Sequence, residues 1–218
     1  MAIIAPSLLS ADFTRMGEEV REIESAGAKV LHIDIMDGHF VPNLTFGYSM
    51  VKALRPLTDM VFDVHLMMTD PIDYIEDFAK AGADVITVHT ECDSDLNECI
   101  DLIHKCGKKA GLSVKPKTAP EVLFNYLDRL EHILIMTVEP GFGGQSMMPE
   151  CLAKIAPIKA ECAARELRIP VMIDGGVNAA NVRTAAEAGA DMMVAGNAVF
   201  GAADRAEAFR RLSERSEI

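Results

Sequence analysis

The sequence predicts an α/β fold, a single (β/α)8 TIM barrel over residues 1–218. Three observations predict this fold. Eight short apolar runs rich in Ile and Val recur along the chain, as is typical of strands covered on both faces. Amphipathic segments with apolar residues three and four positions apart lie between these runs. The 218 residues allow about 27 residues for each strand–helix unit, which is compact but sufficient for this barrel.

The expected elements follow one another in a regular order. The strands are residues 3–5, 30–34, 61–67, 85–89, 110–114, 132–137, 171–174 and 192–196. The helices are residues 13–26, 72–81, 96–104, 121–130, 151–166, 179–188 and 205–212. Asp95, Asn178 and Asp204 stand where helix N-caps are expected. An open, doubly wound sheet is the alternative, but it needs fewer strands and usually has a glycine-rich turn after the first strand, where residues 7–10 read SLLS.

Charge and cysteine content exclude several classes of protein. Acidic residues outnumber basic ones by 33 to 21, which disfavours partners such as nucleic acid and anionic membranes. No stretch approaches the roughly 20 apolar residues that a membrane helix needs. The five cysteines form no CxxC pair, so neither a disulfide framework nor a zinc knuckle is expected. We therefore expect a cytoplasmic protein in a reducing environment.

Four polar side chains interrupt the apolar strands: His32 and Asp34, His65, and Asp174. Residues at the C-terminal ends of barrel strands face the active site, and residues two apart on a strand share a face. Each one alone could be a hydrogen-bonded barrel residue or a cap. Together they predict a site for one divalent metal ion. Nitrogen and oxygen ligands admit Zn²⁺, Fe²⁺, Mn²⁺ or Co²⁺, so the sequence leaves the metal unnamed.

Glycines and methionines also gather at the expected strand ends. Glycine-rich turns occupy residues 140–145, 175–177 and 196–197, and three such turns together predict one phosphate site. Met36, Met67 and Met136 stand at strand ends, where methionine is usually a core gap-filler. The alternative is a polarizable wall beside a bound anion.

Five segments together resemble the ribulose-phosphate 3-epimerase family along almost the whole chain: residues 5–13, 32–43, 63–67, 140–145 and 174–177. HIDIMDGHFVPN at residues 32–43 and PGFGGQ at 140–145 are the most specific of them. The resemblance implies a metal-dependent, homo-oligomeric enzyme. Its substrate would be a small sugar phosphate, with D-ribulose 5-phosphate and D-xylulose 5-phosphate interconverted by epimerisation at C3.

The resemblance also assigns roles to the matching positions. It implies that His32, Asp34, His65 and Asp174 bind the metal, and that Asp34 and Asp174 are the catalytic acid and base. Substrate binding would fall to Ser7, His65, Gly141, Phe142, Gly143, Gly144, Gly175, Gly176, Gly196 and Asn197. Proton removal beside the C2 carbonyl gives an enediolate, which a divalent cation stabilises and the methionines would shield from water.

Two departures from the family pattern concern the substrate. Lys115 stands where the family commonly has the Asn of an Asn-Pro pair, and Gly47-Tyr48 replaces a common Gly-Pro. Lys115 is either solvated or in contact with an anionic substrate. A six-carbon ketose phosphate such as D-allulose 6-phosphate is therefore the alternative substrate.

Two other functions are weighed against epimerisation. Lys115 could form a Schiff base in an aldolase, but such an enzyme has no need of the His/Asp cluster. A phosphate-binding relative without activity would be expected to lack a carboxylate, and both Asp34 and Asp174 are present. Related barrel decarboxylases and hexulose-phosphate synthases carry a lysine on the third strand, where residues 61–68 have none.

Overall fold

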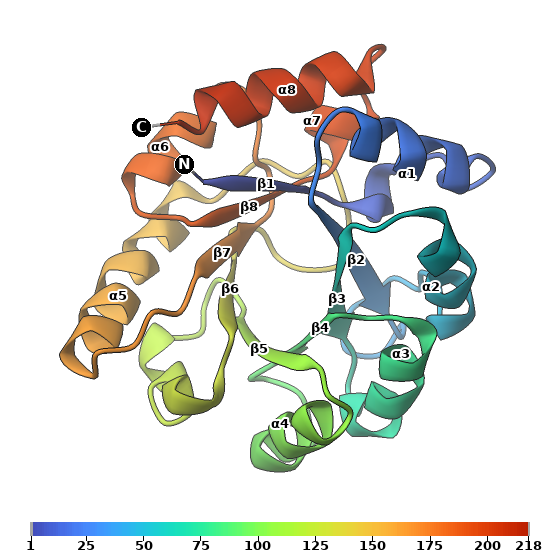
Figure 1. The fold of residues 1–218 in the computed structure, drawn as a ribbon. Helices are drawn as coiled ribbons and strands as arrows, with labels where there is room; N and C mark the ends of the chain where they lie inside the picture. The colour runs from blue at the N-terminus through green and yellow to red at the C-terminus, as the bar shows by residue number, and fades with distance from the viewer. Residues whose placement is uncertain (1, 218) are drawn as a thin grey trace.

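Eight parallel strands form a nearly closed barrel in the computed structural model, which describes residues 2–217 (Figure 1). The strands are β1 (Ile3–Pro6), β2 (Val30–Met36), β3 (Val61–Met67), β4 (Val85–His89), β5 (Lys109–Val114), β6 (His132–Met136), β7 (Val171–Asp174) and β8 (Met192–Ala195). Each strand pairs with its neighbour in the order β1-β8-β7-β6-β5-β4-β3-β2. A bridge between Ser7 and His32 joins β1 to β2. The barrel predicted from the sequence is confirmed.

The outer layer of the barrel consists of helices that follow the strands (Figure 1). They are α1 (Met16–Ser25), α2 (Tyr48–Leu54), α3 (Ile75–Ala81), α4 (Leu96–Lys105), α5 (Ile155–Ala164), α6 (Val182–Glu187), α7 (Asn197–Phe200) and α8 (Arg205–Arg215). Asp95 and Asp204 cap α4 and α8 as predicted, since their side chains accept hydrogen bonds from backbone N–H groups in the first turn. Among the described residues, no helix is long and apolar enough to cross a membrane.

The segment after β5 differs from the prediction. Residues 121–130 were expected to form an α-helix, but this prediction is wrong: the chain forms two short 3₁₀ segments, Pro120–Leu123 and Leu127–Arg129. Their hydrogen bonds span three residues, as from Phe124 N to Glu121 O at 3.1 Å in the first segment. The tighter turns still bury Leu123 and Leu127, so the apolar spacing was correct while the helix type was not.

Three further differences concern two helices that were not predicted and the start of a third. The sequence predicted neither α2 nor α7, and both are short: seven and four residues. Asn178 was expected to cap α6, but α6 begins after Asn181, and Asn178 Oδ1 instead accepts a hydrogen bond from Ala180 N at 2.8 Å. The polar side chain thus shapes the turn before the helix rather than the helix itself.

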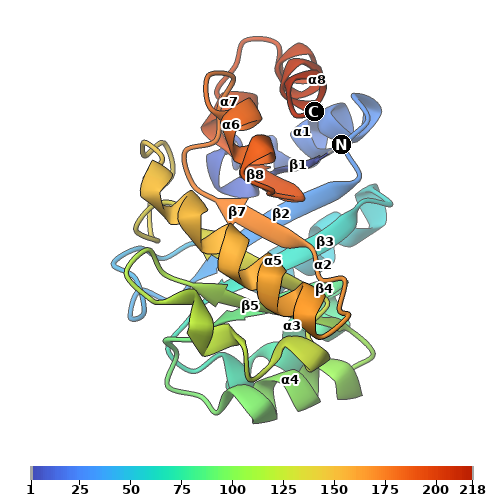
Figure 2. The same cartoon turned by 90° about the vertical axis from the view of Figure 1, so that its left-hand side faces the viewer.

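The last helix of the described residues packs beside the first strand (Figure 2). Arg205 at the start of α8 contacts the buried Glu19 of α1, with 2.6 Å between Nη2 and Oε1. Ser216 Oγ donates a hydrogen bond to Ala2 O at 3.0 Å. These contacts place the last helix against the first strand and the first helix.

Candidate active site

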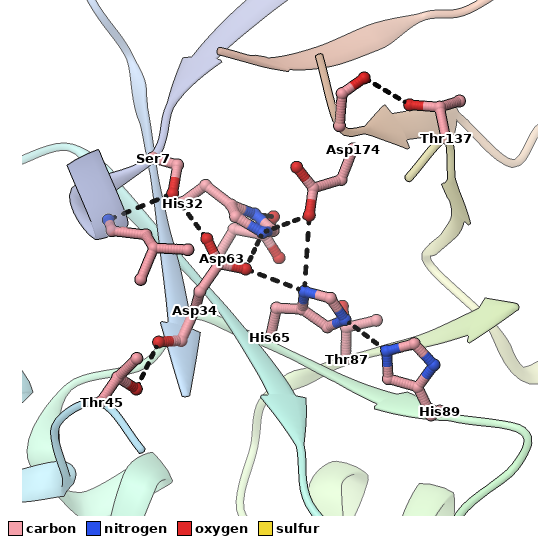
Figure 3. Close-up of polar contacts among 12 residues, drawn as sticks. Ser7, His32, Asp34, Thr45, Asp63, His65, Thr87, His89, Thr137 and Asp174 are labelled. Atoms are coloured by element: carbon pink, nitrogen blue, oxygen red, sulfur yellow. Dashed lines mark hydrogen bonds and ion pairs between the residues drawn. The ribbon is translucent and has the colours of Figure 1, made fainter. Parts of the chain in front are cut away.

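Four of the predicted residues, which lie on β2, β3 and β7, converge at one place (Figure 3). Asp34 Oδ1 lies 3.2 Å from His32 Nε2 and 3.1 Å from His65 Nδ1. Asp174 Oδ2 lies 3.9 Å from each of the same two nitrogens. The four side chains therefore face one point from three strands.

Strand register explains this convergence. His32 and Asp34 are two residues apart on β2, so both point into the barrel. Asp34 is the register partner of His65 on the neighbouring β3. Asp174 ends β7, beside Met136 of β6. Ser7 Oγ donates to Asp34 Oδ2 at 2.5 Å, and Thr45 Oγ1 donates to the backbone oxygen of Asp34 at 2.9 Å. Hydrogen bonds therefore hold both the carboxylate and the backbone carbonyl of Asp34 in place.

The two carboxylates of the site have opposite electrostatic environments. Burial opposes ionisation of Asp34, but the charge of the adjacent His32 and its hydrogen bond favour the carboxylate, and the pKa of Asp34 is lowered. Burial and the negative charge of Asp34 both raise the pKa of Asp174, to about 7. Two carboxyl groups whose pKa values are separated in this way can serve as base and acid in one reaction.

The site also attracts positive charge. Burial opposes the charged form of His32, yet Asp34 and Asp63 raise its pKa well above the ordinary value. Burial lowers the pKa of His65, which therefore favours the neutral imidazole that ligates metals. A metal ion replaces protons held at its ligands, so a site that draws a proton to His32 also suits a cation.

The donor set fits one divalent metal ion. Each of the four residues offers one ligand atom, and these atoms lie within 4.8 Å of one another. Ligand distances of about 2.0–2.2 Å place tetrahedral ligand atoms roughly 3.3–3.6 Å apart. The separations of 3.1–3.9 Å from the two carboxylates to the imidazoles bracket that range. His32, Asp34, His65 and Asp174 can therefore hold a metal ion, and two nitrogen and two oxygen donors suit Zn²⁺, Fe²⁺, Mn²⁺ or Co²⁺.

A cavity of about 260 Å³ opens beside Asp34 and Asp174. Met36, Met67 and Met136 form part of its wall, and each is almost fully buried at the end of its strand. All the predicted substrate-binding residues except His65 line it: Ser7, Gly141, Phe142, Gly143, Gly144, Gly175, Gly176, Gly196 and Asn197. His32 and His65 have no exposed surface and lie behind the carboxylates.

Loops after β6, β7 and β8 form the rim of this cavity. Gln145 Nε2 donates to the backbone oxygens of Glu139 and Phe142, at 2.8 and 2.9 Å, and so closes the loop after β6 on itself. Asn43 Nδ2 ties that loop to the one after β2 through Gly141 O at 2.7 Å. Gly176 has a φ of +68°, and a Cβ atom there would lie 2.2 Å from Met147 N. Only glycine allows the loops after β6 and β7 to approach this closely.

Lys115 lies outside this cavity. Its ammonium lies 3.6 Å above the centre of the Phe40 ring, and both residues line a neighbouring cavity with Glu139 and Phe142. The side chain is therefore neither free in solvent nor beside Asp34 and Asp174.

The sequence analysis missed two groups of residues. Ser10, Gln145, Ser146 and Asn178 also line the cavity. Behind the four candidate ligands lie Asp63, Thr87, His89, Glu91 and His132. Asp63 and His89 could have been found by the signal that identified His65, because each is a polar residue in an apolar strand.

Solved structures similar to this chain share its barrel. KGPDC from Streptococcus mutans matches with a TM-score of 0.74 at 15% sequence identity, covering 100% of this chain and 98% of that chain. A 3-hexulose-6-phosphate synthase from Salmonella typhimurium matches with a TM-score of 0.70 at 16% identity, covering 98% of both chains. At such low identity the likeness shows the fold alone. With the strand-end site, it defines the class as a TIM-barrel enzyme.

Sequence comparisons identify the family within that class. The model of the ribulose-phosphate 3 epimerase family matches residues 3–200. A ribulose-phosphate 3-epimerase from Synechocystis sp. is 48% identical over 99% of this chain and 95% of that protein. One from Bacillus subtilis is 46% identical over 97% of this chain and 98% of that protein. The chain belongs to the ribulose-phosphate 3-epimerase family, and the resemblance seen in the sequence is confirmed.

Proposed function

We propose that this enzyme interconverts D-ribulose 5-phosphate and D-xylulose 5-phosphate by moving a proton at C3 between Asp34 and Asp174. The observation that carries the proposal is the pair itself. Both carboxyl groups line one cavity, they come from β2 and β7, and their pKa values are shifted in opposite directions. An epimerase needs one ionised and one protonated group at the same carbon.

The proton transfers follow from these environments. The ionised Asp34 removes the C3 proton from one face of the substrate, leaving an enediolate. The protonated Asp174 returns a proton to the opposite face and becomes ionised, so C3 is inverted without net oxidation. The reverse direction starts from the other protonation state, and exchange with solvent resets the pair.

The remaining groups position the substrate. Backbone N–H groups of the loops around Gly143, Gly176 and Gly196 would bind the phosphate. Met36, Met67 and Met136 would cover the reacting carbons and exclude water. Ser7 would hold Asp34 in place through the hydrogen bond already described, while touching the sugar.

His32, Asp34, His65 and Asp174 would hold the metal ion. When bound, a divalent cation supplies positive charge that stabilises the negative charge developing on the oxygens at C2 and C3. Its identity is left open, since all four candidate metals accept this donor set. Homo-oligomerisation, a cytoplasmic location and the absence of nucleic-acid partners stay predictions.

A Schiff-base mechanism at Lys115 has less support. The ammonium contacts the Phe40 ring, and Lys115 does not line the cavity that holds the two carboxylates. Borohydride trapping with a ketose phosphate is expected to leave Lys115 unmodified, and an adduct there would replace the epimerase proposal with an aldolase.

The decisive experiment is a C3-epimerisation assay of D-ribulose 5-phosphate against D-allulose 6-phosphate, with metal analysis of the same sample. We expect the pentulose phosphate to be the better substrate and about one divalent ion per chain. A higher kcat/KM for the hexulose phosphate would assign the six-carbon reaction instead. Inactivity toward both would refute the proposed function.

A further inference from the structure

A chain of side-chain contacts leads from the site into the barrel wall. His65 Nε2 lies 2.9 Å from His89 Nε2, on the side of the ring away from Asp34 (Figure 3). His89 Nδ1 lies 3.1 Å from Glu91 Oε2. His65 and His89 have no exposed surface, so water cannot replace either contact. The proposed proton transfers use neither His89 nor Glu91.

Glu91, the last residue in this series of contacts, is held in place by hydrogen bonds. Glu91 Oε1 accepts hydrogen bonds from Lys115 N, at 2.7 Å, and from the Thr118 hydroxyl. The Phe40 ring covers His89, with 4.8 Å between ring centres. The loop after β5 thus fixes the position of Glu91, whose other carboxylate oxygen contacts His89.

The direction of each hydrogen bond follows from this anchor. A carboxylate oxygen only accepts, so His89 Nδ1 carries the proton in that contact. The other nitrogen of a neutral His89 is then an acceptor, which requires the proton of His65 to be on Nε2. A neutral His65 therefore presents the lone pair of Nδ1 to the site, where Asp34 Oδ1 lies only 3.1 Å away.

We propose that His89 and Glu91 are positioning residues that set the tautomer and ring orientation of His65, so that its Nδ1 serves as a metal ligand. This inference rests on the proposed metal-dependent function. Two acceptors facing each other at 3.1 Å repel unless a cation lies between them. Partners that orient a ligating histidine in this way typically contribute 10–100-fold in metal affinity.

Four variants test the contacts from His65 through His89 to Glu91. The measured quantity is the Kd for Zn²⁺, determined by chelator competition on the metal-free full-length protein without substrate. We expect His89→Leu to weaken Zn²⁺ binding by 10–100-fold, because it removes the acceptor for His65. His89→Gln can still accept from His65 and donate to Glu91, so its Kd should stay within about threefold of the wild-type value. Glu91→Gln must turn its NH₂ group toward His89 or toward Lys115 N–H, so we expect roughly tenfold weaker binding.

The fourth variant, His104→Gln, is the matched control. His104 pairs with Glu131 at 3.2 Å on the partly exposed side of α4, outside the barrel, so Zn²⁺ affinity should not change. Unchanged Kd values in both His89→Leu and Glu91→Gln would overturn the inference. Equal losses in His89→Leu and His89→Gln would also overturn it, since packing rather than hydrogen-bond direction would then matter.

A spectroscopic measurement keeps the inference testable if His89→Leu fails to fold. Long-range ¹H–¹⁵N correlation spectra of the Zn²⁺-loaded wild-type protein report which imidazole nitrogen of each histidine carries a proton. We expect protons on His65 Nε2 and His89 Nδ1, and a proton on His65 Nδ1 would refute the inference. Neither readout uses epimerase activity, so failure of this inference is distinguishable from failure of the proposed reaction.

Discussion

His32 Nδ1 lies 2.7 Å from Asp63 Oδ2, on the side of the imidazole ring away from Asp34. Asp63 is on β3, where its register partner is His32, and it is almost fully buried. Since the carboxylate accepts from Nδ1–H, it directs the other nitrogen, Nε2, toward the cavity. Both candidate histidine ligands thus have a buried partner behind them, although the two partners differ in chemistry.

The first prediction concerns this partner. Asp63→Asn can still accept a hydrogen bond from His32, but it lacks the negative charge that strengthens the contact. We expect Zn²⁺ affinity and kcat each to fall about 10–100-fold. Chelator competition and steady-state kinetics measure the two effects. An unchanged Zn²⁺ Kd in a variant with a wild-type Tm would show that Asp63 serves only the core.

The second prediction concerns the catalytic roles of Asp34 and Asp174, tested separately from any effect on folding. Asp34→Asn and Asp174→Asn should each abolish inversion at C3, because an amide neither removes nor returns the proton on its own face of the substrate. A positioned general base or acid contributes about 10²–10⁴-fold, so turnover should fall at least that far. NMR of the substrate follows formation of the other epimer, and circular dichroism checks folding. Normal turnover in either variant would refute the two-carboxylate mechanism.

The sequence predicted the barrel and the four clustered residues because both depend on strong local signals. The eight apolar runs mark the strands, and His32, Asp34, His65 and Asp174 interrupt them. The contacts among the residues behind the site could not be predicted in the same way. Whether Asp63 backs His32 depends on the register between β2 and β3, and whether Glu91 reaches His89 depends on a loop conformation.

The third prediction concerns stability and pH. The ordinary pKa of an aspartate is 3.8, and burial with the nearby Asp34 raises that of Asp174 to about 7. The folded metal-free protein therefore holds a proton that the unfolded chain releases, and this stabilisation is lost as pH rises from about 4 to 7. Asp174→Asn should accordingly be more stable than the metal-free wild type at pH 8, by about 4 kcal/mol, and equally stable below pH 4.

Urea unfolding in the presence of a chelator measures this difference. Excess Zn²⁺ provides the control, because it should narrow the difference at pH 8: a ligand at 100 times its Kd adds about 2.7 kcal/mol to the stability of the wild type, and the variant lacks one metal ligand. If the difference between the two proteins did not depend on pH, Asp174 would be ionised in the folded metal-free protein.

The fourth prediction addresses Lys115, which replaces the usual asparagine. Its ammonium lies over Phe40, so Lys115→Met should lower stability by about 0.5–1 kcal/mol. The same change in a Phe40→Leu background should have little effect, because the contact is already absent. We expect kcat/KM for D-ribulose 5-phosphate to stay within about twofold, as Lys115 does not line the main cavity. A several-fold rise in KM would instead indicate contact with the anionic substrate.

The last prediction compares two glycines in the loops proposed to bind phosphate. Gly144 and Gly176 have similar φ values, +75° and +68°, so alanine is strained at both positions. Only Gly176 is also crowded: its Cβ would lie 2.2 Å from Met147 N, whereas nothing lies within 4 Å of one at Gly144. Gly144→Ala should therefore lose only the backbone term of stability, about 1–2 kcal/mol. Gly176→Ala must also push the loops after β6 and β7 apart, so we expect a larger loss of stability and a KM for sugar phosphate raised at least tenfold. Equal effects of the two substitutions would show that backbone conformation, rather than the close approach of these loops, requires glycine at position 176.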